Sequence, residues 1–150
     1  MLKVKQLKYK FDKTTFEFNF DLTDNNIVGV IGKSGSGKST LFNLLAGFLK
    51  PNNGSIFFND NNITYLKPPE RNISILFQDH NNFNHLTIFE NIILGIDPDM
   101  KQNQNNFKIV KNIMKKVSLS IDLNKKVSDL SGGEQQRVSI ARSLLRKKSL

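Results

Sequence analysis

The first twenty residues of the chain alternate between apolar and polar side chains. Phe16, Phe18 and Phe20 fall on one side of this alternation, and the residues between them are polar. A period of two places neighbouring side chains on opposite faces of a strand. The pattern therefore predicts half-buried antiparallel strands within residues 1–20.

Three short apolar runs follow, at residues 27–31, 56–58 and 73–77. The first reads Ile-Val-Gly-Val-Ile and is apolar throughout, which is typical of a strand that is covered on both faces. We expect residues 27–31 to form such a buried strand, and we expect the two later runs to form further strands.

Apolar residues then recur at helical spacing, beginning at Leu41, Leu44, Leu45 and Phe48. The turn-forming sequence Pro-Asn-Asn-Gly at 51–54 is expected to end this helix.

The second half of the chain has a mostly helical pattern. Thr87 and Glu90 have the spacing of a capping box, which predicts a short helix that Gly95 ends. Residues 98–106 are polar and are expected to form an exposed loop. The next helix should bury one stripe, which consists of Phe107, Val110, Met114 and Val117. Ser131 is expected to cap a last helix, whose apolar positions are Val138, Ala141, Leu144 and Leu145.

Composition removes several classes of function. The chain has no cysteine, so it has no disulfide, no thiolate nucleophile and no cysteine-ligated metal. No apolar run approaches the roughly 20 residues that span a bilayer, and a cytoplasmic location is the default. The net charge of +9 suggests nucleic-acid binding as a candidate function. However, the basic residues are scattered, and an Asn- and Lys-rich composition is what AT-rich coding DNA produces. We expect no nucleic-acid partner.

Residues 32–40 fit the pattern G-x-x-x-x-G-K-[ST] of phosphate-binding loops. The segment consists of Gly32, Lys33, Ser34, Gly35, Ser36, Gly37, Lys38, Ser39 and Thr40. Glycines let backbone N–H groups converge on an anion. Lys38 is expected to reach the β- and γ-phosphates, and the Ser39 hydroxyl to bind Mg²⁺. A glycine-rich turn with an accidental Lys-Ser is the alternative. The apolar run before the loop and the helix after it favour a site for ATP or GTP.

A second anion site is suggested by residues 130–137, which read Leu-Ser-Gly-Gly-Glu-Gln-Gln-Arg. Ser131, Gly132, Gly133 and Glu134 combine a hydroxyl and two bare backbone positions with a helix N-terminus. Alone, this would be an ordinary serine cap. In one chain with the phosphate loop, it resembles the signature motif of ABC-type ATPases. The resemblance implies that this motif serves the ATP of a second subunit, with Glu134 standing where many members have Gln.

The resemblance also implies a fold: an α/β P-loop NTPase of the ABC ATPase type. We expect one ATP-binding domain over 1–150, with a nucleotide-binding core at about 1–80 and a helical subdomain with the signature helix at 81–145. The core would combine an N-terminal antiparallel β section with the strand–loop–helix unit of the phosphate loop. ATP and Mg²⁺ are the implied ligands, and a second copy of the chain is the implied partner.

Two further site residues rest on the resemblance. Gln78 matches a glutamine that in ABC ATPases contacts Mg²⁺ and the attacking water. An aromatic residue upstream of the phosphate loop stacks on adenine in this family. Phe11 is the first candidate for that role, and Tyr9 is the second.

The middle of the chain resembles importer ATPases in particular. The matching segments are 68–71, 76–83, 85–87 and 91–95 with Pro98 nearby. The likeness is nearest to the subunits that energise thiamine import, although those for iron, polyamines or sulfate share the general motifs. It implies transmembrane permease subunits, a periplasmic binding protein and a peripheral location on the cytoplasmic face of the bacterial inner membrane. ABC proteins that act on DNA or ribosomes fit this segment poorly.

Segment 79–95 would then dock on a permease. Phe83, Leu86 and Phe89 are candidate contacts, and the amphipathic pattern fits a role in the helix core equally well.

ABC ATPases also carry, after the signature helix, a strand that ends in an Asp and a Glu, and later a histidine. None of these matches a residue within 1–150, and we therefore expect these residues to lack the C-terminal part of the core sheet. Two interpretations stay open. The favoured one is the N-terminal portion of a full ATPase. The other is a short protein that binds nucleotide without turning it over. In both cases hydrolysis by this chain alone should be near background.

Overall fold

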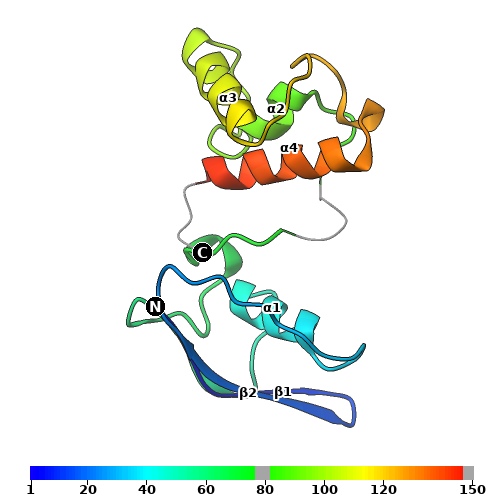
Figure 1. The fold of residues 1–150 in the computed structure, drawn as a ribbon. Coiled ribbons are helices and arrows are strands. Elements are labelled where there is room, and N and C mark those ends of the chain that lie inside the picture. The colour runs from blue at the N-terminus through cyan, green and yellow to red at the C-terminus, as the bar shows by residue number, and fades with distance from the viewer. Residues whose placement is uncertain (77–81, 147–150) are drawn as a thin grey trace. The chain divides into compact units, whose positions relative to one another are not determined.

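The computed structural model describes residues 1–76 and 82–146. The chain forms two compact units, residues 1–73 and residues 74–150 (Figure 1).

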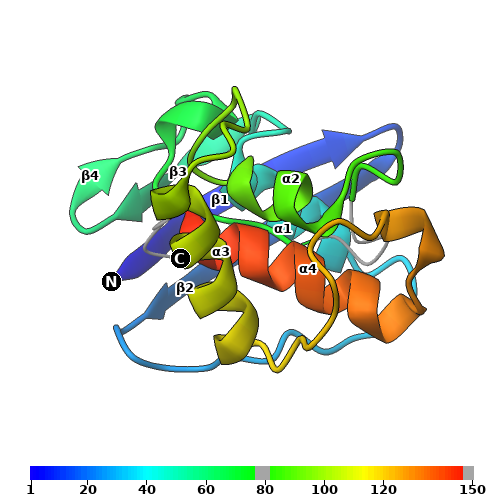
Figure 2. The same cartoon turned by 90° about the horizontal axis from the view of Figure 1, so that it is seen from above.

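The first unit contains an antiparallel four-stranded sheet with the strand order β2-β1-β3-β4. The strands are β1 (Leu2–Phe11), β2 (Thr14–Leu22), β3 (Asn53–Phe58) and β4 (Asn61–Asn62). β1 pairs with β2 along almost its whole length and with β3 on its other side (Figure 2). The antiparallel strands predicted within 1–20 and the strand predicted at 56–58 are confirmed.

A bulge in β1 keeps its apolar residues on one face. Leu2, Val4 and Leu7 are all buried, although the step from Val4 to Leu7 breaks the period of two. The register of both neighbouring strands shifts in this interval, where Gln6 has a φ of 44°. A bulge inserts one residue and so returns the next apolar side chain to the same face. The bulge thereby brings Leu7 back to the core side of the sheet.

Helix α1 (Lys38–Ala46) covers this face of the sheet (Figure 1). Leu41 and Leu44 are buried in one cluster with Val4 and Ile56. The helix ends at Gly47, whose φ of 86° is the left-handed conformation of a glycine cap. The expected stop at 51–54 is therefore wrong, and Phe48, which was expected on the buried stripe, is 53% exposed.

A buried arginine explains this early end. Arg71 follows the 3₁₀ turn η1 (Pro68–Glu70), and its side chain is almost entirely buried. Its guanidinium donates to the carbonyls of Leu44 and Leu45 at 2.6 and 2.7 Å. A Cβ atom at position 47 would lie 2.6 Å from Arg71 Nε. The last turn of α1 therefore gives its carbonyls to Arg71, and only glycine fits beside it.

The same guanidinium also binds the connection after β4. Nε donates to the carbonyl of Leu66 at 2.9 Å, and Nη2 donates to the carbonyl of Thr64 at 2.8 Å. Its positive charge lies at the C-terminal end of α1, where the helix dipole favours a cation. Burial lowers the pKa of Arg71, because the charged form loses hydration.

The buried strand predicted at residues 27–31 is not formed. These residues have no regular secondary structure, and Ile27 and Ile31 are almost completely exposed. Residues 73–76 are likewise irregular, and residue 77 lies outside the described residues. A strand requires hydrogen bonds to a neighbouring strand. Among the described residues, every strand of the sheet pairs within β1 to β4, and neither of these runs joins it.

The second unit is helical. Its elements are α2 (Ile88–Ile93), α3 (Gln104–Lys116), η2 (Val127–Asp129) and α4 (Gly132–Leu145). α2 and α3 pack against each other and against α4 (Figures 1 and 2). The core includes Phe89, Val110, Val127 and Val138. The three predicted helices are confirmed. The expected loop at 98–106 is too long, because Asn103 caps α3 and the helix begins at Gln104. Leu144 is 53% exposed rather than buried.

None of the helices in the part of the chain that the structure describes is both long and apolar enough to cross a membrane.

Candidate nucleotide-binding site

The loop before α1 is curled around the ammonium group of Lys38. Lys38 Nζ donates to the carbonyls of Gly32 and Lys33, each at 2.8 Å. The backbone N–H of Ser36 donates to the carbonyl of Lys33 at 3.2 Å, which closes the tip of the loop. The loop therefore holds the lysine ammonium with two carbonyl oxygens, which phosphate oxygens would replace when a polyphosphate binds.

Glycines at two positions give the loop its shape. Gly35 and Gly37 have φ values of 81° and 91°, where other residues are strained. Gly37 is also the N-cap of α1. The first-turn N–H groups of Lys38, Ser39 and Thr40 have no acceptor within the helix and so face the loop. This helix N-terminus favours an anion, and the exposed Ser39 hydroxyl lies at its start.

An aromatic residue that the sequence analysis did not single out lies against this loop. A Cβ atom on Gly37 would come within 2.5 Å of the Phe16 ring. Phe16 pairs across the sheet with Tyr9, so both side chains share one face. Phe11 follows on the same face at the end of the hairpin and is 67% exposed. The alternation placed Phe16 on the apolar side of its strand, but the spacing carried no signal of its contact with the loop.

The second predicted anion site lies at the start of α4, which Ser131 caps. The backbone N–H and the hydroxyl of Ser131 both donate to Glu134 Oε2, each at 2.7 Å. These hydrogen bonds lower the pKa of Glu134 below its usual range. A Cβ atom added to Gly132 or Gly133 would meet nothing within 4 Å, so this backbone is open to an approaching molecule.

The glutamine predicted to contact Mg²⁺, Gln78, lies outside the described residues. Within residues 1–76 and 82–146, no three His, Cys, Asp or Glu side chains are grouped as a metal site. The Ser39 hydroxyl remains the described candidate ligand for Mg²⁺.

A buried asparagine organises the segment that was predicted to meet a permease. Asn91 Oδ1 accepts from the N–H of Phe83 at 2.9 Å, and Nδ2 donates to the carbonyls of Phe83 and Thr87 at 2.9 and 3.1 Å. Phe83 is 47% exposed and lies beneath the guanidinium of Arg142, with 5.4 Å between Cζ and the ring centroid. Phe89 belongs to the core, so the core interpretation is confirmed for that residue.

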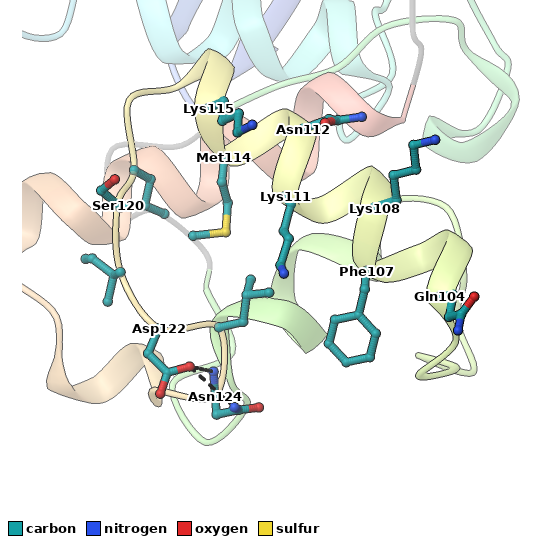
Figure 3. Close-up of a pocket in the computed structure, with 13 residues that line it drawn as sticks. Gln104, Phe107, Lys108, Lys111, Asn112, Met114, Lys115, Ser120, Asp122 and Asn124 are labelled. Carbon is teal, nitrogen blue, oxygen red and sulfur yellow. Dashed lines mark hydrogen bonds between the residues drawn. The ribbon is translucent and has the colours of Figure 1, made fainter.

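A groove of about 1000 Å³ lies between α3 and segment 119–124. Phe107 and Lys111 extend from α3 toward this segment, whereas Lys108 turns away (Figure 3). The Asp122 carboxylate in its wall accepts from the N–H of Asn124. No glycine lines the groove, so it lacks the converging backbone of the loop at 32–40 and is a poor site for a triphosphate.

Comparison with known proteins gives the same family as the phosphate loop at 32–40 and the signature segment at 130–137. The model of the family described as ABC transporter matches residues 16–150, and the chain therefore belongs to the ABC transporter family. Its fold is that of an ABC-type ATP-binding cassette.

The similar curated proteins include ATP-binding proteins of thiamine import. The chain is 40% identical over 148 residues to the thiamine import ATP-binding protein ThiQ of Aliivibrio fischeri, with 99% of this chain and 63% of that protein covered. It is 42% identical over 142 residues to ThiQ of Vibrio cholerae, with 95% of this chain and 60% of that protein covered. The chain thus spans about three-fifths of the length of these relatives.

Solved cassettes share the fold. The ATP-binding cassette MJ1267 aligns with a TM-score of 0.86 at 25% identity, covering 98% of this chain and 65% of that one. The cassette MJ0796, a dimer in a post-hydrolysis state bound to ADP and Pi, aligns with a TM-score of 0.79 at 28% identity, covering 97% and 70%. The protein cbiO1 of Clostridium perfringens, part of the ABC transporter complex cbiONQ, aligns with a TM-score of 0.81 at 30% identity, covering 97% of this chain and 61% of that one.

Proposed function

We propose that the protein is the ATP-binding subunit of an ABC importer, and that it couples ATP binding and hydrolysis to the uptake of thiamine or thiamine pyrophosphate. The observation that carries nucleotide binding is the loop curled around Lys38 at the N-terminus of α1. The identity of about 40% to ThiQ proteins supports thiamine as the cargo.

The loop residues would share the work of holding ATP. Backbone N–H groups of 32–40 cradle the phosphates, and Lys38 exchanges its two loop carbonyls for β- and γ-phosphate oxygens. The Ser39 hydroxyl, together with Gln78, would hold Mg²⁺. When bound, Mg²⁺ neutralises the charge that develops on the phosphates during transfer. Gln78 would orient the attacking water.

The assembly would contain two copies of the chain. The segment from Ser131 to Glu134 is proposed to close on the ATP of the second copy, and the dimeric cassette MJ0796 supports such a pairing. Transmembrane permease subunits, and through them a periplasmic binding protein, would complete the importer. The subunit would then lie on the cytoplasmic face of the inner membrane.

The proposed cargo can be tested by uptake in cells. Deletion of the gene should abolish accumulation of labelled thiamine, while uptake of iron and of spermidine stays unchanged. The native gene on a plasmid should restore thiamine uptake, and the Lys38→Ala gene should not. Normal thiamine uptake in the deletion strain, with loss of iron or spermidine uptake, would reassign the cargo.

Phe11 is proposed to stack on adenine, and Phe11→Ala should weaken ATP binding about tenfold, since stacking of a base on an aromatic ring contributes about 1–3 kcal/mol. Affinity for inorganic tripolyphosphate, which has no base, should not change. Phe48→Ala is the matched control, because Phe48 is an exposed aromatic of the same unit. Equal losses for ATP and tripolyphosphate would contradict stacking, and a larger loss in Tyr9→Ala would transfer the role to Tyr9.

A further inference from the structure

The hydroxyl proton of Ser131 is already committed within its own chain. The hydroxyl and the backbone N–H of Ser131 both donate to Glu134 Oε2, each at 2.7 Å. A serine hydroxyl has one proton, and an ionised carboxylate accepts hydrogen bonds but donates none. Ser131 therefore cannot donate to a phosphate oxygen without first breaking its bond to Glu134.

The charge of Glu134 strengthens this restraint. Hydrogen bonds to an ionised acceptor are roughly twice as strong as those to a neutral one, so an amide at this position would hold the hydroxyl less tightly. The N-terminus of α4 stabilises the carboxylate, and the lowered pKa keeps it ionised at neutral pH. The carboxylate also places a negative charge where the triphosphate of a second copy would approach, and like charges repel.

We propose that Glu134 restrains the signature segment: it withholds the Ser131 proton and repels the incoming triphosphate, so that nucleotide-driven pairing of two copies is weaker than it would be with an amide at this position. This inference rests on the proposed function, in which the segment meets the ATP of a second copy. It assigns to Glu134 a regulatory effect on pairing that Gln at the same position would lack.

The test measures pairing of the full-length protein by sedimentation, with Mg²⁺ and the non-hydrolysable analogue AMP-PNP. Glu134→Gln keeps the size of the side chain and an oxygen that can accept from Ser131, and it should lower the dissociation constant of the dimer about tenfold. Glu90→Gln is the matched control. Glu90 accepts the N–H and the hydroxyl of Thr87 at 2.8 and 2.9 Å in an equivalent capping box, so it loses the same charge at another helix start. Pairing should not change in this control.

A double variant separates the withheld proton from simple repulsion. In a Ser131→Ala background, Glu134→Gln should strengthen pairing by less than about threefold. This smaller gain comes from the loss of charge repulsion, so high salt should remove it. An undiminished gain in that background would overturn the role of the Ser131 proton.

Two other outcomes would also count against the inference. Equal pairing of the native protein and Glu134→Gln, or an equal gain in Glu90→Gln, would overturn it while leaving nucleotide-dependent pairing intact. If AMP-PNP binds but no variant pairs, the signature segment does not serve a second copy. That result would overturn the dimer of the proposed function and this inference with it.

Discussion

Lys38→Ala should lower the affinity of the full-length protein for ATP on the order of 100-fold, because hydrogen bonds between charged groups contribute about 1.5–3 kcal/mol and Lys38 is expected to make more than one to the phosphates. The same substitution removes the two bonds that hold the carbonyls of Gly32 and Lys33 around the ammonium group. The loop would lose both its ligand for the phosphates and part of its shape. Calorimetric titration with ATP in the presence of Mg²⁺ measures the change.

Lys33→Ala is the matched control for this prediction. Lys33 carries the same charge in the same loop, but its side chain is exposed, and its carbonyl, which Lys38 uses, is kept in the variant. We expect a loss of less than about threefold, which is the scale of a screened surface charge. Equal losses in the two variants would show that net charge near the loop, rather than the placement of Lys38 Nζ, governs binding.

The features that the sequence predicted well are those that a few neighbouring residues determine. Thr87 with Glu90 and Ser131 with Glu134 form their capping hydrogen bonds at the predicted helix starts. Both interactions span three residues, so the spacing alone contains the geometry. The phosphate loop is equally local, because its shape depends on glycines and on a lysine six residues from its start.

The features that were missed depend on residues far apart in the sequence. The apolar run at 27–31 has the composition of a buried strand, but local pattern cannot supply the neighbouring strand that such a segment needs. The contact of Phe16 with Gly37 joins a strand to a loop that is distant in the chain. The end of α1 at Gly47 depends on Arg71, which lies more than twenty residues later.

Arg71→Met should cost about 3–5 kcal/mol of folding free energy in the first unit. The methionine fills much of the same space, but it removes the guanidinium donor from the carbonyls of Leu45, Leu66 and Thr64. The carbonyl of Leu44 also loses Arg71 but keeps the N–H of Gly47 at 3.2 Å. A buried carbonyl that loses its partner costs about 1–3 kcal/mol. Partial entry of water keeps the total below the simple sum. Because small domains are stable by only about 5–15 kcal/mol, urea denaturation followed by circular dichroism should show a clearly earlier transition.

Two comparison variants distinguish the hydrogen bonds of Arg71 from its charge. Lys50→Met removes a positive charge from an exposed side chain of the same unit, and its free energy of unfolding should change by less than about 0.5 kcal/mol. Arg71→Lys keeps the charge, but a single ammonium cannot reach the carbonyls of α1 and those of residues 64 and 66 together. We expect it to recover less than half of the loss. Full recovery by lysine would mean that the charge at the C-terminus of α1, rather than the guanidinium fork, holds this end of the helix in place.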